Sequence, residues 1–155
     1  MRRADREVTD EQGTLDILEQ CSVCRIALQD EHGLYIVPVN FGFVFEDGTM
    51  TLYFHGAKQG RKADALREGA QVAFEMDCGH RLDEGAQACE YSFSYASIIG
   101  SGTASILEET VEKQKALALL MRHQTGRDFA FTEEQADAVS VFKVEADAYS
   151  AKRRA

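Results

Sequence analysis

The segment from residue 33 to residue 67 constrains the fold of this chain more than any other. Two runs rich in β-branched and aromatic side chains, residues 34–45 and 50–55, flank the sequence Glu46-Asp47-Gly48. Such runs are typical of β-strands, and an Asp-Gly pair between them is a strong signal for a tight hairpin turn. The sequence therefore predicts a β-hairpin here, followed by a short helix over residues 61–68 that ends at Gly69.

Two residues in the first of these strands are unusual for a central position in a sheet. Pro38 has no backbone N–H to donate to a neighbouring strand, so it indicates an edge strand, a bulge or a ligand close by. Asn40 follows in the same apolar run, although asparagine is depleted from strands. The pattern predicts that this strand lies at an exposed edge or beside a site.

The end of the second strand carries the best candidate for an anion site. His55 is followed by Gly56 and Ala57, which are small enough to let a ligand approach the backbone, and then by Lys58, Arg61 and Lys62. Positive side chains beside the free N–H groups of a helix start suit a phosphate. The alternative is a solvated basic loop before a surface helix.

The remainder of the chain reads as strands with peripheral helices. Thr9 and Gln12 form a capping-box pattern before a helix over residues 10–20, and residues 110–124 form the clearest helix. Strands are predicted over residues 23–29, 71–77, 90–106 and 139–145, with a loop at 78–89 and a linker at 125–138 that includes one helical turn after Thr132. About six strands predict a small antiparallel barrel, although the pattern does not distinguish it from an open sheet.

Three smaller features are interpreted as parts of the fold and not as functional sites. Tyr91, Phe93 and Tyr95 alternate at strand spacing, so packing in the core or in a dimer is the expectation, and Gly100 and Gly102 predict a bend or bulge. His123 lies in the last turn of the clear helix, where a cation is stabilising. The basic end, residues 152–154, is expected to be solvated.

Cys21 and Cys24 form a C-x-x-C pair, which raises thioredoxin-like exchange or zinc as functions. Cys21 follows a predicted helix and does not begin one, whereas a reactive thiol of that class sits at a helix N-terminus. Cys78, His80 and Cys89 lack the short spacing of a zinc site. Buried structural thiols are the leading interpretation, with metal and redox roles left open.

Composition narrows the class of protein. A chain of 155 residues predicts one domain, residues 1–155, and 45% apolar with 28% charged residues is ordinary for a soluble protein. A formal net charge of -9 argues against general binding to nucleic acids or anionic membranes. The charged start of the chain has no apolar run behind it, so we expect a cytoplasmic protein with reduced cysteines.

A set of motifs in order along the chain resembles a known family. Val37-Pro38-Val39-Asn40-Phe41-Gly42 precedes Leu52-Tyr53-Phe54-His55-Gly56-Ala57-Lys58, with Gly60 and Lys62 after it, and Asp5-Arg6-Glu7, residues 95–102 and residues 119–127 agree. Their order and spacing resemble the nitroimidazole-resistance (Nim-type) branch of the pyridoxamine 5'-phosphate oxidase-like flavoproteins. The resemblance implies an FMN-binding split β-barrel with the flavin at a homodimer interface.

The resemblance also implies roles for particular residues. Val39, Asn40 and Phe41 would contact the flavin ring, Lys62 with Lys58 or Arg61 would bind its phosphate, and Ala57 and His55 would lie beside the pocket. Ser97 would reach the flavin of the partner subunit. Ala96 stands where similar proteins often carry arginine, and Ser150-Ala151-Lys152 where a glycine-lysine is common, so contacts from those points are in doubt.

The implied activity is FMN-dependent reduction of a nitroaromatic or related small acceptor. His55 is the candidate catalytic residue, because an imidazole can bind a substrate or pass a proton near neutral pH. The alternatives are a haem-binding split barrel with His55 or His123 as axial ligand, and a non-catalytic flavin-binding module.

Overall fold

The computed structural model describes residues 3–67 and 69–154. Its elements, in chain order, are η1 (Ala4–Arg6), β1 (Glu7–Val8), α1 (Glu11–Gln20), β2 (Val23–Asp30), β3 (Gly33–Asn40), β4 (Gly42–Glu46), β5 (Thr49–Gly56), α2 (Arg61–Leu66), β6 (Ala70–Asp83), η2 (Ala88–Glu90), β7 (Ser92–Ile106), α3 (Thr110–Thr125), α4 (Glu133–Asp137) and β8 (Ser140–Arg154).

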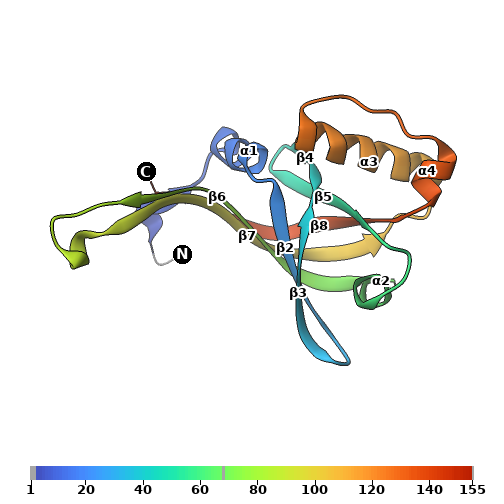
Figure 1. The fold of residues 1–155 in the computed structure, drawn as a ribbon, viewed down its shortest axis with the longest axis horizontal. Helices are drawn as coiled ribbons and strands as arrows, with labels where there is room; N and C mark the ends of the chain where they lie inside the picture. Colours follow the sequence, from blue (N-terminus) through green and yellow to red (C-terminus); the bar gives the residue numbers. More distant parts are fainter. Residues whose placement is uncertain (1–2, 68, 155) are drawn as a thin grey trace.

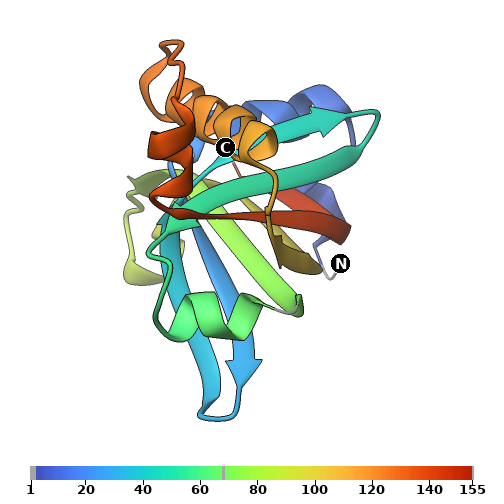
Figure 2. The same cartoon turned by 90° about the vertical axis from the view of Figure 1, so that its right-hand side faces the viewer.

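One antiparallel sheet organises the molecule. Its strand order is β3-β2-β6-β7-β8-β5-β4, and β1 pairs with the far end of β8. The sheet curls into a barrel that stays open between β3 and the β4–β5 hairpin, with α3 and α4 across one end (Figures 1 and 2). This is the split barrel that the sequence resemblance predicts, with eight strands in place of about six.

The concave side of the sheet holds the main hydrophobic core. Its largest fully buried side chains include Phe41, Phe54, Phe74 and Phe142, and α1 adds Ile17 and Leu18. The rings of Phe54 and Phe142 stack with centroids 5.1 Å apart. Aromatic side chains bury large apolar areas, so this cluster supplies much of the driving force for closing the barrel.

The predicted hairpin is confirmed only in its second half. Residues 34–45 are two strands: β4 pairs with β5 as expected, but β3 pairs with β2 through the turn at Glu31 and His32. The chain leaves β3 at Phe41 and enters β4 at Gly42, which lies directly against the backbone of α3 at Leu120 and leaves no space for a side chain. The edge position inferred from Pro38 is confirmed, since β3 is the first strand of the sheet.

Two strands, β6 and β8, run far beyond their predicted ends. The loop expected at residues 78–89 is wrong up to Asp83, because β6 continues through a register shift between Cys78 and Arg81. β8 likewise runs on to Arg154, so residues 152–154 are not a solvated end but pair with β7 and β1. The bulge inferred from Gly100 and Gly102 is confirmed by a register shift at Ser101 and Gly102.

The helices follow their predicted positions. The cap of α1 differs, because the Asp10 carboxylate and not Thr9 accepts the N–H of Gly13 (2.7 Å). Thr132 and Gln135 form the expected capping box of α4. α2 ends at Leu66, two residues before the predicted end, and Glu68 lies outside the described residues. Among the helices that the structure describes, none is long and apolar enough to cross a membrane.

Gly42 provides a test of the packing between β4 and α3. A Cβ at this position would lie 2.6 Å from Cα of Leu120, so we expect Gly42→Ala to lower the free energy of unfolding by about 3 kcal/mol. Gly126, the left-handed cap of α3 with φ +69, has open space around it, and its change to alanine should cost only about 1 kcal/mol. Urea denaturation of both variants checks this, and equal losses would contradict the close packing.

Candidate functional site

Lys62 is the cation placed best for binding an anion. It lies in the first turn of α2 and is partly buried, with Nζ 5.6 Å from the ring centroid of Phe54 and 5.7 Å from that of Phe142. The ammonium donates to the backbone oxygen of His55 (3.4 Å), a neutral partner. Desolvation lowers the pKa of Lys62. A cation held against a carbonyl keeps its charge available for a ligand.

His55 and Gly56 complete this corner of the barrel. A side chain at position 56 would meet Lys62 Nζ at 2.6 Å, so the glycine is required for Lys62 to lie where it does. The His55 ring is exposed at the end of β5. Its pKa is lowered, first by desolvation and then by the charge of Lys62. Both effects favour the neutral imidazole, which can accept one hydrogen bond and donate another.

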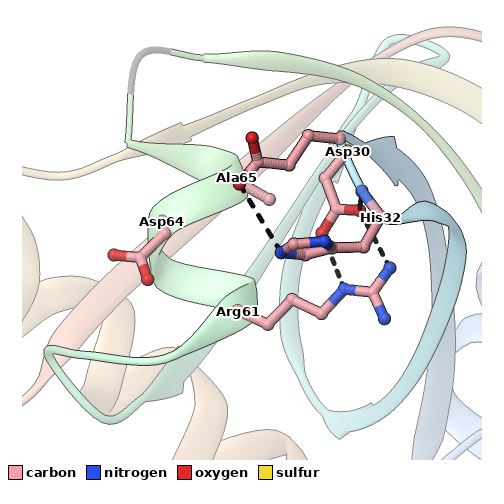
Figure 3. Close-up of a pocket in the computed structure, with 6 residues that line it drawn as sticks. Asp30, His32, Arg61, Asp64 and Ala65 are labelled. Carbon is pink, nitrogen blue, oxygen red and sulfur yellow. Dashed lines mark hydrogen bonds and ion pairs between the residues drawn. The ribbon is translucent and has the colours of Figure 1, made fainter.

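Arg61 is committed to a different contact (Figure 3). Its Nε donates to Asp30 Oδ2 (2.6 Å) and its Nη2 to Asp30 Oδ1 (2.9 Å), and its guanidinium lies 4.4 Å from the ring centroid of Tyr35. The Arg61 guanidinium holds the pKa of Asp30 at about 2. This clamp ties α2 to the β2–β3 turn beside an open cavity of about 520 Å³, and so fixes the position of Lys62.

Two other residues of the predicted anion site, Ala57 and Lys58, are exposed to solvent. Both lie between β5 and α2. They are close in sequence to Lys62 and leave the approach to it open. The structure thus brings His55, Ala57, Lys58, Arg61 and Lys62 to one corner, with Lys62 as the partly buried member.

The predicted ring-binding residues lie at the other end of β3. Val39 and Phe41 are buried in the core, so only their backbone can face a ligand. The amide nitrogen of Asn40 donates to the carbonyl of Ser22 (3.0 Å), and Gln124 of α3 donates to the carbonyl of Phe41 (2.9 Å). Because β3 is an end strand, one side of its backbone has no neighbouring strand among the described residues.

Ser97 is far from this corner within one chain. His55 pairs with Val141 and Ser97 pairs with Lys152, eleven positions apart along β8. At about 3.3 Å per residue the path along the strand is about 35 Å. The structure therefore does not bring Ser97 to the same site in a single copy.

Cys21, Cys24 and His123 pack inside the molecule, whereas Cys78 is partly exposed and Cys89 is exposed. Cys21 and Cys24 are free thiols buried in the core, as predicted, and desolvation raises the pKa of Cys24 to about 12. No group of three metal-ligating side chains occurs within residues 3–67 and 69–154. His123 Nε2 lies 2.8 Å from the oxygen of Cys21, with its ring between those of Phe41 and Phe43.

The sequence did not reveal three supporting residues: Asp30, Tyr35 and Gln124. Each acts on a partner at least 26 residues away, through Arg61 for the first two and through Phe41 for the third. The one local signal was the Asp-Glu-His-Gly turn, which placed Asp30 at a strand end but gave it no partner.

Comparison with known proteins identifies the family of this chain. The model of the pyridoxamine 5'-phosphate oxidase family matches residues 10–153. The chain belongs to this family. No curated protein matches the sequence significantly.

Solved structures agree with the family assignment. A candidate 5-nitroimidazole antibiotic resistance protein from Bacteroides thetaiotaomicron is 32% identical, with 95% of this chain and 86% of that chain covered and a TM-score of 0.79. An FAD and heme binding protein from Mycobacterium smegmatis is 23% identical over 96% of this chain and 73% of that one, also with a TM-score of 0.79. The flavocytochrome from Azotobacter vinelandii is 17% identical over 100% and 72%, with a TM-score of 0.79. The last two likenesses show the fold alone.

The ion pair between Arg61 and Asp30 should have a measurable effect on the pKa of Asp30. Because Arg61 stabilises the carboxylate of Asp30, that carboxyl should titrate near pH 2, and in Arg61→Ala it should move up toward the ordinary aspartate value of about 3.9. The stabilisation by this pair is present above pH 4 and is lost as the pH falls through about 2. Carboxyl NMR measures both values, and an unchanged Asp30 in the variant would contradict the clamp.

Lys62 should control the titration of His55. Lys62→Met keeps an unbranched chain over the two rings but removes the charge, so the His55 pKa is expected to rise toward 6.5 without reaching it, because desolvation remains. Histidine NMR through a pH titration tests this. Lys115→Met, an exposed change on α3, should leave the His55 resonance unaffected.

Proposed function

We propose that this protein is a homodimeric FMN-dependent oxidoreductase that reduces a nitroaromatic or related small acceptor. The observation that carries the proposal is the partly buried Lys62, whose ammonium has the uncharged backbone oxygen of His55 as its hydrogen-bond partner. The family assignment and the 32% identical candidate nitroimidazole resistance protein support the reaction class.

The spacing along β3 suits an elongated ligand with a phosphate at one end and a flat ring at the other. Arg61 and Tyr35 place α2 beside the start of β3, and Asn40 lies five residues further on, about 17 Å away at about 3.3 Å per residue. In this arrangement Lys62 binds the phosphate, with Lys58 close by. The backbone of β3 at Val39 and Asn40 offers hydrogen bonds to the polar rim of the ring, and Phe41 could add only its N–H, because its carbonyl already accepts from Gln124.

A reduced flavin held here would supply two electrons, and with two protons these would convert a nitro group to a nitroso group and water. His55 lies at the phosphate-side corner, and its neutral ring donates a hydrogen bond to an acceptor or holds a proton for it. Arg61 acts through its clamp on Asp30, which holds the first turn of α2 in place.

The resemblance assigns Ser97 to the flavin site, and this assignment is compatible with the fold only if the flavin lies between two copies. A path of about 35 Å along β8 separates it from the corner at His55, so a contact between Ser97 and the cofactor requires a second copy of the chain. The flavin then lies between two subunits, as the family resemblance implies.

The first experiment is an absorbance spectrum after FMN is added and excess removed, followed by turnover with NAD(P)H and a 5-nitroimidazole. Retained flavin peaks and turnover support the proposal. A Soret band in the purified protein would overturn it in favour of haem, and flavin without turnover would leave a binding module.

Lys62 should contribute to the affinity for FMN, which has a phosphate, but not to the affinity for riboflavin, which has none. Lys62→Met removes one charge-assisted hydrogen bond to phosphate, so the Kd for FMN is expected to rise about 10-fold or more, while the Kd for riboflavin stays unchanged. Flavin fluorescence titration measures both constants. Lys115→Met is the matched control, and an equal loss for both ligands would show that Lys62 serves packing and not phosphate binding.

A further inference from the structure

The C-x-x-C pair has no part in the proposed activity, and the fold gives Cys21 a neighbour other than Cys24. Cys21 is the buried residue that closes α1, and α1 packs on β6 and β7. Its thiol shares a hydrogen bond with the thiol of Cys78 on β6. Burial and then the Cys78 thiol raise the pKa of Cys21, whereas burial and the Glu75 carboxylate raise that of Cys24. The structure therefore joins Cys21 to Cys78 and leaves Cys24 as a separate thiol.

The register of the sheet explains why these two thiols meet. β2 runs antiparallel to β6 with Ile26 opposite Phe74, and both side chains lie in the core. Because side chains alternate across a strand, Cys78 lies on the same face of β6 as Phe74, four residues further on. Four residues back from Ile26 is Ser22, which directly follows Cys21. The end of α1 thus delivers the Cys21 thiol to the core face of β6 at Cys78.

The two thiols differ in their access to solvent. Cys78 is partly exposed, whereas Cys21 is buried and its raised pKa keeps it protonated. Only a thiolate attacks an oxidant readily, so a reagent from solvent reacts at Cys78. The register of β6 shifts directly after this residue, where Gly79 has φ +67. A bulge interrupts the ladder of hydrogen bonds, so the backbone beside Cys78 can adjust as two sulfur atoms in contact become bonded.

We propose that Cys21 and Cys78 form a redox-active pair that a peroxide converts to a disulfide. The Cys78 thiolate attacks one oxygen of hydrogen peroxide, the O–O bond breaks, and a sulfenic acid forms as the first water is released. The sulfur of Cys21 then attacks that of Cys78, the S–O bond breaks, and the hydroxide takes the proton of the Cys21 thiol and leaves as a second water. Two thiols lose two electrons, and one peroxide is reduced to two waters. A dithiol reverses the change by thiol–disulfide exchange.

The backbone next to this pair holds the end of β3 and the end of α3. The oxygen of Cys21 lies 2.8 Å from Nε2 of His123. The oxygen of Ser22 accepts the side-chain amides of Asn40 (3.0 Å) and Gln124 (3.1 Å). A covalent bond from Cys21 to β6 repositions both carbonyl groups. The oxidation state of the pair is therefore transmitted to Asn40, at the proposed ring site, and to α3.

The first test counts thiols in denaturant after peroxide treatment of a Cys89→Ser protein, which lacks the exposed cysteine. Of the three thiols that are left, only that of Cys24 should remain, and dithiothreitol should restore the other two. Intact mass identifies the product, because a disulfide removes two hydrogen atoms whereas a sulfinic acid adds two oxygen atoms. Three thiols that survive the peroxide, or a protein that gains oxygen and forms no disulfide, overturn the inference.

Matched variants identify the partners within the same background. Cys24→Ala should still form the disulfide, whereas Cys21→Ala and Cys78→Ala should lose it. Cys21 and Cys24 are both core positions, and Cys78 is partly exposed, so the three changes separate loss of a partner from damage to the core. A disulfide that disappears with Cys24→Ala and survives Cys78→Ala would show the C-x-x-C bond instead and overturn the pairing.

The second test follows side-chain amide resonances by NMR before and after oxidation, without flavin. Those of Asn40 and Gln124 should shift when the disulfide forms and return with dithiothreitol. Gln71, whose amide donates to Thr103 (2.8 Å), is the control, because it lies seven residues from Cys78 along β6, about 23 Å at about 3.3 Å per residue. Unmoved Asn40 and Gln124 amides in the oxidised chain would overturn the transmission. Neither test uses flavin, so a failed FMN titration and a failed oxidation are separate results.

Discussion

The pairing of β7 with both β6 and β8 is the constraint on which the rest of the structure depends. β7 pairs from Ser92 to Ala104 with β6 and from Tyr95 to Ile106 with β8, and both neighbours bend with it. Its alternate residues fill the core on one side and leave a convex face on the other. The part of the β6–β7 hairpin that extends beyond β8 follows from where this pairing ends, at Tyr95.

Local patterns in the sequence were enough for the elements whose signals are local. The helices at α1, α3 and α4, the β4–β5 hairpin and the edge position of Pro38 follow from periodicity, turn residues and the chemistry of proline. The continuation of β6 through residues 78–83 could not be predicted, because Gly79 and the charges there read as a loop. Only pairing with β7 makes them a strand.

At the candidate site, too, local sequence patterns predict some features and long-range contacts decide the others. The motif around His55 and Lys62 predicts an anion site at this corner, with Lys62 as the first candidate cation and Lys58 or Arg61 beside it, but it does not say how the three side chains differ. The fold separates them: Lys58 lies in solvent, Arg61 binds Asp30 across 31 residues, and Lys62 lies over two core rings. Such differences come from long-range contacts that no local pattern records.

The position of Lys62 on the stacked pair of Phe54 and Phe142 joins the candidate site to the centre of the core. Ala63 and Leu66 of the same helix are themselves buried. A ligand that holds Lys62 therefore acts on the packing of the whole barrel, and a change deep in the barrel acts on the ligand. Occupancy of this corner and resistance to unfolding are therefore coupled, and a substitution in either core ring would change both.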